Sequence, residues 1–281
     1  MHTLHIDHYF CIGSTHQRAG EPCQDYALSG TLAHGRVYGI VCDGCSGANA
    51  RTDLGARVLA LAMEQLLHKT ATLAECFTPL FVQHIQERLL TMPLGGTVQD
   101  YLASAVAFCA DGHTAKFFMA GDGAVAVRRC DGTVEITEAS WPDNAPFYLG
   151  YCLQPAVLAQ FAAHEAADGP TVQLRTETRS QASGTVESTK AIPTEEFRQG
   201  WTTEVQLNTV DALMVCSDGI SQISAVEPLD AATAFLAFKN HVGSFVKRRA
   251  IKALQHWHSG GHITQDDFSM AALARVPEDS A

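Results

Sequence analysis

The sequence predicts an α+β fold in which antiparallel sheets are covered by helices. Many short apolar segments are separated by turn residues, which is the pattern of β-strands. The longer segments with helical periodicity fall into only two blocks, so strands and helices do not alternate as they would in a parallel βαβ sheet. With 281 residues, of which 46% are apolar, the chain is long enough to bury a substantial core.

The N-terminal half is predicted to contain a helical block between two groups of strands. In the first helix of that block, apolar residues recur every three or four positions from Leu54 to Leu66, which gives the helix one apolar face. Pro93 ends the second helix, and the turn Asp111-Gly112 joins two strands as a hairpin. The elements expected here are strands at Tyr26–Leu28 and Val37–Cys42, helices at Thr52–His68 and Leu73–Met92, and strands at Tyr101–Ala110, Thr114–Ala120 and Ala124–Arg129.

The C-terminal half is predicted to contain a polar segment, two strands, a helical region and a last strand. The segment from about residue 163 to residue 190 is rich in Thr, Ser, Gln, Glu and Ala. We therefore expect an exposed insertion or a mobile loop there. The ordered elements expected in this half are strands at Thr203–Leu207 and Ala212–Cys216, a helical region at Ala231–Trp257 and a strand at Phe268–Arg275.

Charge and cysteine content exclude several classes of protein. The chain has 19 basic and 30 acidic residues and a formal charge of −11, which disfavours nucleic-acid and anionic-membrane partners. We find neither a signal peptide nor an apolar stretch long enough for a transmembrane helix. The cysteines number nine and lie mostly in apolar segments, a pattern typical of reduced thiols in the cytoplasm.

Acidic residues stand at the ends of five of the expected strands. Asp43, Asp122 and Asp218 each follow a strand, whereas Asp25 and Asp266 precede one. In an antiparallel sheet the C-terminal end of one strand lies beside the start of its neighbour. The five carboxylates are therefore expected to converge on one edge of a sheet, where their mutual repulsion calls for hard cations.

The type of residue beside each carboxylate also favours a metal site. One Asp-Gly pair after a strand is usually only a turn, but three such pairs considered together with an Asp-Asp pair before the last strand favour metal binding. Mg²⁺ and Mn²⁺ prefer oxygen ligands and keep several waters, so about three or four carboxylates and a carbonyl suffice. A glycine lets its own carbonyl approach a metal closely. The pairs are Asp43-Gly44, Asp122-Gly123, Asp218-Gly219 and Asp266-Asp267.

Five short blocks that contain these carboxylates form an ordered set. They are Gly20–Asp25 (GEPCQD), Val41–Gly44 (VCDG), Gly121–Gly123 (GDG), Cys216–Gly219 (CSDG) and Thr264–Ser269 (TQDDFS). In this order and spacing they resemble the motifs of the PPM family, the type 2C metal-dependent serine/threonine protein phosphatases. The resemblance spans about Ile12 to Leu273, and the first block is similar to the bacterial branch, in which Gln precedes the first Asp.

The resemblance implies a fold and a domain organisation. The fold is an αββα sandwich of two antiparallel sheets flanked by helices, with a binuclear metal centre at one end. Residues 1–281 would form a single phosphatase domain. The polar segment around residues 163–190 would be a flap-like insertion that shapes access of the substrate.

The resemblance also implies roles for individual residues. Asp43, Asp218 and Asp266 would be the catalytic residues, and Asp43 would bridge two Mn²⁺ or Mg²⁺ ions. Asp25 would bind a metal or orient metal-bound water, while Asp122 would help Asp218 to hold a third, weaker ion. The implied metal ligands are Asp25, Asp43, Gly44 through its carbonyl, Asp122, Asp218 and Asp266.

The sequence departs from the family at the position that binds phosphate. Many members carry an Arg five residues before the first motif Asp, and here that position is Gly20. The nearest cations, His16 and Arg18, are the candidate phosphate-binding residues. The alternative, considered equally with phosphate binding, is that both are ordinary cations in a loop. Arg51 is a further candidate for phosphate binding.

The implied reaction is hydrolysis of phosphomonoesters. Two metal ions about 4 Å apart lower the pKa of a shared water, and the resulting hydroxide attacks phosphorus in line. The expected partner is a phosphoprotein, with the enzyme opposing a Ser/Thr kinase. Two alternatives stay open: a catalytically weak regulatory module of the same fold, and a two-metal phosphohydrolase that acts on small phosphate esters.

Overall fold

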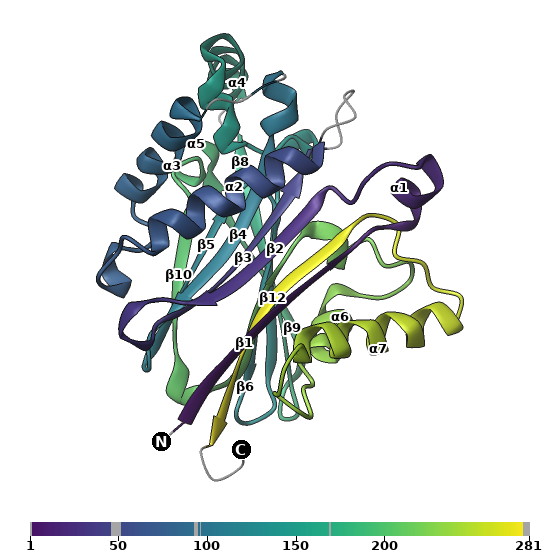
Figure 1. Cartoon of the computed structure of the whole chain (residues 1–281). Helices are drawn as coiled ribbons and strands as arrows, with labels where there is room; N and C mark the ends of the chain where they lie inside the picture. The colour runs from purple at the N-terminus through teal and green to yellow at the C-terminus, as the bar shows by residue number, and fades with distance from the viewer. Residues whose placement is uncertain (1, 46–51, 93–94, 96, 169, 278–281) are drawn as a thin grey trace.

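Two antiparallel β-sheets pack face to face, and helices cover both outer faces (Figure 1). The computed structural model describes residues 2–45, 52–92, 95, 97–168 and 170–277. This arrangement confirms the predicted α+β class and the αββα sandwich. The seven-stranded sheet has the order β1 (His2–Cys11), β12 (Phe268–Pro277), β11 (Val210–Cys216), β6 (Gly123–Arg129), β7 (Val134–Ser140), β8 (Thr171–Ser180) and β9 (Gly184–Pro193). The five-stranded sheet has the order β10 (Trp201–Gln206), β5 (Thr114–Ala120), β4 (Ala103–Ala110), β3 (Val37–Gly44) and β2 (Asp25–Thr31).

The central strands are apolar because both of their faces are buried. In β11, Leu213 and Val215 point into the core between the two sheets. Met214 and Cys216 alternate with them and point to the opposite face, where they pack beneath helices. A strand covered on both faces reads as a continuous apolar run, and this explains why the central strands were predictable from the sequence.

Helices α2 (Thr52–Leu67) and α3 (Pro79–Thr91) lie against the five-stranded sheet (Figure 1). In α2, Leu59, Met63 and Leu67 recur every four residues and are buried, so they form the apolar face that rests on the strands. Helices α6 (Pro228–Phe235) and α7 (Phe245–Ser259) cover the seven-stranded sheet. The other helices are α1 (Ser14–Ala19), α4 (Pro155–Asp168) and α5 (Thr194–Phe197).

Two predicted helical regions are interrupted in the structure. The helix expected at Leu73–Met92 begins only at α3, where the Thr78 side chain accepts a hydrogen bond from the Phe81 amide at 3.2 Å. Phe77, just before this cap, has a φ of 58°, which no right-handed helix accommodates. The region expected at Ala231–Trp257 is divided into α6 and α7, and Gly243 turns the intervening chain with a φ of 61°.

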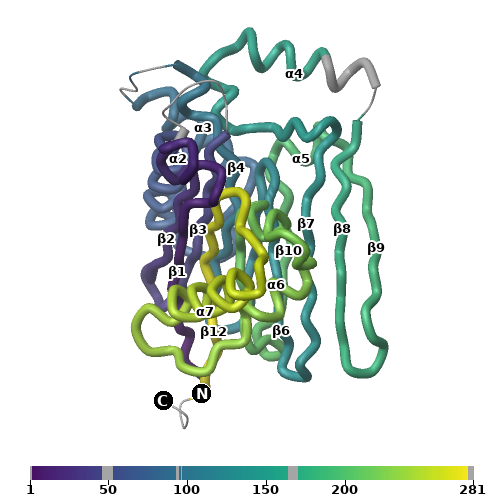
Figure 2. Tube along the Cα trace, turned by 90° about the vertical axis from the view of Figure 1, so that its right-hand side faces the viewer, coloured from purple at the N-terminus to yellow at the C-terminus, as the bar shows by residue number. Residues whose placement is uncertain are grey.

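In its described part, the polar segment from residue 163 to residue 190 forms regular structure, so a mobile loop is wrong, and the alternative of an exposed insertion stays a prediction. It contains the end of α4, the whole of β8 and most of β9, and these two strands pair as a long hairpin at the edge of the sheet (Figure 2). Nearly all side chains of β9 are exposed, Ile192 being buried. An edge strand that faces solvent on both sides requires no apolar alternation, and this is why its composition resembled a loop.

No helix in the described ranges is both long enough and apolar enough to cross a membrane.

Candidate metal centre

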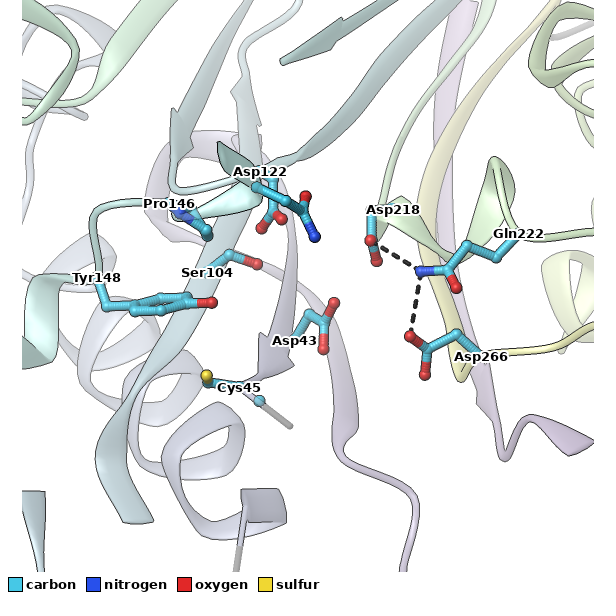
Figure 3. A pocket seen from close by; sticks show the side chains of 11 residues that line it. Asp43, Cys45, Ser104, Asp122, Pro146, Tyr148, Asp218, Gln222 and Asp266 are labelled. Carbon is cyan, nitrogen blue, oxygen red and sulfur yellow. Dashed lines mark hydrogen bonds between the residues drawn. The ribbon is translucent and has the colours of Figure 1, made fainter. Parts of the chain in front are cut away.

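A polar cavity of about 360 Å³ lies where the ends of the two sheets meet. Four carboxylates from four separate stretches of the chain face into it (Figure 3). The structure thus brings together most of the acidic residues that were predicted to converge. The cavity is lined by Asp43, Gly44, Cys45, Ser104, Asp122, Asn144, Pro146, Tyr148, Asp218, Gln222 and Asp266.

Asp43 stands at the centre of the carboxylate group. It is the penultimate residue of β3, with Gly44 last, so the pair ends the strand itself instead of following it. Across the sheet, Asp43 pairs with Asp25 of β2 on one side and with Ser104 of β4 on the other. Neighbouring strands therefore fix the backbone of Asp43 from both sides.

Asp122 enters the cavity from the tight turn between β5 and β6. The glycines on either side of it adopt φ values of 89° and 127°, which side chains rarely tolerate. At Gly121 a Cβ would lie 2.6 Å from the Cβ of Ser104, so only glycine lets the turn approach β4 so closely. The turn residues that the sequence displayed as Gly-Asp-Gly thus position the carboxylate.

Asp218 and Asp266 lie on the side of the seven-stranded sheet. Asp218 begins the 3₁₀ turn η7 (Asp218–Ile220) after β11, and Asp266 precedes β12, which pairs with β11 in antiparallel fashion. The Nε2 of Gln222 donates hydrogen bonds to Oδ2 of Asp218 at 2.9 Å and to Oδ2 of Asp266 at 3.1 Å (Figure 3). A single amide therefore links the two carboxylates.

Asp25 is not among the residues that line the cavity, although it was predicted as part of the same centre. It is 1% exposed and lies behind Asp43, its partner across the sheet. Its Oδ2 accepts a hydrogen bond from the Ser217 hydroxyl at 2.7 Å, and its Oδ1 has no hydrogen-bond partner in the described ranges. This position suits a residue that orients Asp43.

Burial and mutual repulsion make these carboxylates hard to ionise without a counter-charge. Burial, followed by the charges of Asp25, Asp218 and Asp122, raises the pKa of Asp43 well above its usual value. Burial and the charge of Asp218 raise the pKa of Asp122 to about 7. Burial also raises the pKa of Asp218, and it raises that of Asp25 to about 7.

The donor set fits divalent cations. The described residues that line the cavity include no Lys, Arg or His side chain that would neutralise the carboxylates. Carboxylate and backbone carbonyl oxygens are the ligands that Mg²⁺ and Mn²⁺ prefer. Cations bound there would also offset the raised pKa values, since an opposite charge favours the ionised carboxylate.

The two candidate phosphate-binding residues lie away from the cavity lining. Arg18 is exposed on α1, and its guanidinium donates hydrogen bonds to the carbonyl and the hydroxyl of Ser14. His16 is buried on the same helix and faces the carboxylates of Asp266 and Asp267 from behind. The third candidate, Arg51, lies outside the described residues.

Several residues of the site carried no recognisable signal in the sequence. Gln222 lies four residues after Asp218 in the sequence, and this short separation was the one indication that Gln222 belongs to the site. Ser104 reaches the cavity because β4 pairs with β3, and Tyr148 reaches it from the segment before α4, which contacts β4. Their contribution depends on tertiary structure and not on a local motif.

Solved structures of bacterial phosphatases share this fold. A bacterial serine phosphatase superimposes with a TM-score of 0.59 at 12% identity over 97% of both chains. The serine/threonine phosphatase Stp1 from Staphylococcus aureus gives 0.58 at 13% identity, covering 97% of this chain and 95% of that one. The catalytic domain of the serine/threonine phosphatase PstP, solved with two manganese ions, gives 0.56 at 14% identity, with 99% and 100% coverage.

At these identities the structural matches establish the fold alone, and the sequence itself gives the family. No curated protein matches the chain significantly. A family profile described as Protein phosphatase 2C matches residues 12–258, which is most of the chain. The chain therefore belongs to the protein phosphatase 2C family and is a metal-dependent protein phosphatase.

Proposed function

We propose that this cavity hydrolyses phosphoserine and phosphothreonine esters of a phosphoprotein with the help of two Mn²⁺ or Mg²⁺ ions. The observation that carries the proposal is the group of four carboxylates around one cavity, with no basic side chain among the described lining residues. Asp43, Asp218 and Asp266 would hold the two tighter ions, together with the carbonyl of Gly44. Asp122 would hold a third and weaker ion with Asp218.

The chain's own residues orient these ligands. Ser217 donates to the buried Asp25, and Asp25 in turn supports Asp43 across the β2–β3 pair. Gln222 keeps the carboxylates of Asp218 and Asp266 at a fixed separation. When bound, the divalent cations supply Lewis-acid polarisation of the phosphoryl group and an activated water.

Pro146 and Tyr148 line the side of the cavity opposite Gln222 (Figure 3). Burial raises the pKa of the Tyr148 hydroxyl, so this group stays protonated and can donate a hydrogen bond to a phosphoryl or leaving-group oxygen. No guanidinium is found among the described lining residues, so none of these residues gives a phosphate the bidentate contact of an arginine. We therefore expect weak binding of isolated phosphate.

The β8–β9 hairpin supports a role for the polar segment in substrate access. Arg175 of β8 lines a second cavity of about 420 Å³, and this cavity shares Asp122, Asn144 and Asp218 with the first. A peptide that places its phosphate at the carboxylates can therefore extend along β8. We propose that residues 163–190 shape access in this way within a single catalytic domain.

The protein is proposed to act in the cytoplasm and to oppose a Ser/Thr kinase. All nine cysteines are free thiols, which fits a reducing compartment. The kinase follows from the substrate class, since phosphoserine and phosphothreonine arise by transfer of a phosphoryl group to a hydroxyl.

An assay of the purified chain on phosphoserine, phosphothreonine and phosphotyrosine peptides tests the function. Hydrolysis of the first two peptides should require Mn²⁺ or Mg²⁺ and stop with EDTA. Asp218→Asn should reduce the rate at least about 10²-fold, as expected when a major electrostatic group is lost. The matched control is Glu204→Gln, which removes the same charge from the exposed strand β10 and should not alter the rate.

The same assay separates the two alternatives. Metal binding without turnover of any phosphopeptide would identify a regulatory module. Faster hydrolysis of nucleotides or other small esters than of phosphopeptides would identify a different phosphohydrolase. Either result contradicts the proposal.

A further inference from the structure

The short helix α1 is fastened to the segment that carries Asp266. The amide of Ser14 donates to the carbonyl of Thr264 at 2.9 Å, and the amide of Thr15 donates to the carbonyl of Gln265 at 3.0 Å. A Cβ added to Gly13 would lie 2.1 Å from the carbonyl carbon of Asp266. The backbone before α1 therefore touches the backbone of a proposed metal ligand.

His16 projects from α1 into the interior behind that ligand. The residue is 6% exposed, and its Nδ1 lies 3.1 Å from Oδ1 of Asp267 and 3.6 Å from Oδ1 of Asp266. Its orientation falls short of a hydrogen bond, and Nδ1 has no other partner within the described part of the chain. A buried ring nitrogen without a partner is costly, so its direction toward two carboxylates calls for an explanation.

The two carboxylates differ in how they are held. Asp267 is buried and accepts hydrogen bonds from two backbone amides, that of Gly13 at 2.6 Å and that of Gln24. Asp266 faces the cavity; its Oδ1 accepts from the amide of Asp267 at 2.8 Å, and its Oδ2 accepts from Gln222. Asp267 is thus fixed by backbone hydrogen bonds, whereas the carboxylate of Asp266 faces the cavity and has His16 on the side away from the cavity.

We propose that His16 is a positioning residue that holds Asp266 in its metal-binding orientation by directing its Nδ1–H at the Asp266–Asp267 pair from behind, where Oδ1 of Asp267 lies 3.1 Å and Oδ1 of Asp266 lies 3.6 Å from Nδ1. The inference rests on the proposed function, in which Asp266 is a metal ligand. Partners of a ligating carboxylate fix its orientation, and their loss typically lowers metal affinity by about 10–100-fold. This role replaces phosphate binding for His16, because Asp266 stands between the ring and the cavity.

Four variants of the full chain test this role, with Mn²⁺ binding measured by calorimetry and stability measured in EDTA. Asn places its side-chain nitrogen where histidine has Nδ1, whereas Gln places it at the position of Nε2. We therefore compare His16→Asn, His16→Gln and His16→Ala with Glu21→Gln. The last removes the carboxylate 3.8 Å from Nε2, on the outer side of the ring, and serves as the control.

The expected pattern separates a donor at Nδ1 from simple packing. His16→Gln and His16→Ala should weaken one Mn²⁺ site at least about tenfold, while His16→Asn and Glu21→Gln should stay within about threefold of the wild type. Melting temperatures of His16→Asn and His16→Gln in EDTA should agree. KM for a phosphothreonine peptide at saturating Mn²⁺ should not change.

Three results would overturn the inference. Equal Mn²⁺ affinity for His16→Gln and the wild type would remove the positioning role, and so would a loss in His16→Asn as large as in His16→Ala. Unchanged Mn²⁺ affinity with a raised KM would return His16 to phosphate binding. Wild-type protein that binds Mn²⁺ with this variant pattern but hydrolyses no phosphopeptide would contradict the phosphatase proposal and leave the role of His16 standing.

Discussion

At the scale of single residues, the site holds groups that oppose folding. The carboxyl of Asp43 is buried among three others of the same charge, which is why its pKa lies well above the usual value. A fold selected only for stability would not keep this arrangement. Bound cations would offset the repulsion among the carboxylates. Neutralising one carboxylate should therefore raise the stability of the metal-free protein and lower its activity.

The change Asp43→Asn tests this opposition. In EDTA the variant should melt about 2–4 °C above the wild type, because Asn has the same size but avoids the cost of burying a carboxylate or protonating it on folding. In Mn²⁺ the order should reverse, and phosphothreonine hydrolysis should fall at least about 10²-fold. Differential scanning calorimetry in each condition measures both melting temperatures.

Glu204→Gln is the control for that comparison, because its carboxylate is exposed on β10. It should melt like the wild type in both conditions. An Asp43→Asn variant that folds but is less stable than the wild type in EDTA would contradict the account of the carboxylate group.

At the scale of elements, apolar strands and strand-end carboxylates were predictable, and polar elements were not. Strands β4, β5 and β11 are buried on both faces and stand out as apolar runs. The hairpin of β8 and β9 lies at the edge of its sheet, and its buried apolar side chains are limited to Val172, Leu174 and Ile192, so the apolar alternation is too short to indicate strands. Composition alone could not distinguish it from a loop.

The candidate site shows the same division. The motif residues Asp43 and Asp218 were identified from their strand ends. The bridge made by Gln222 depends on Asp266, which is distant in sequence, so no local pattern indicates it. His16 was predicted as a phosphate contact from its charge and its place in the chain, yet the fold turns it toward the back of Asp266.

The edge hairpin supplies a prediction of its own through Arg175. This side chain lines the second cavity while it pairs with Glu177 and Glu187, both at 2.9 Å. Arg175→Ala should raise KM for a phosphothreonine peptide several-fold, with little change in kcat or in Mn²⁺ affinity. Hydrolysis of p-nitrophenyl phosphate should not change, because this small ester does not extend along β8.

Arg179→Ala is a matched control for that change. Arg179 is on the same strand with the same 41% side-chain exposure, but it pairs with Asp230 and is not among the residues that line the cavity. Equal KM values for the two variants would contradict the proposed path of the substrate along β8.

At the scale of the whole molecule, the carboxylates determine how stability depends on pH when no metal is bound. Asp25 and Asp122 have their pKa raised from 3.8 to about 7, chiefly by burial. The folded state therefore binds protons that the unfolded state has already released near neutral pH. The stability linked to these protons is fully present below the unfolded pKa and is lost as pH rises through about 7.

In EDTA we therefore expect the melting temperature to fall between pH 5 and pH 7.5 by more in the wild type than in Asp122→Asn. Both proteins contain the same histidines, so the difference between their pH profiles reports the contribution of Asp122. With Mn²⁺ present the fall should vanish or reverse, because the ligands must lose protons to bind metal. Identical pH profiles for the two proteins in EDTA would show that Asp122 is not a source of the dependence.

If the carboxylate-lined cavity is the metal centre of this phosphatase, the wild type and its carboxylate variants must bind different numbers of Mn²⁺ ions, and calorimetric titration with Mn²⁺ counts these ions. We expect the wild type to bind two Mn²⁺ ions tightly and Asp218→Asn to lose at least one of them. Asp122→Ala should keep both tight ions and lose only a weaker third ion. Undiminished Mn²⁺ binding by Asp218→Asn, or no binding by the wild type, would contradict this assignment of the metal centre.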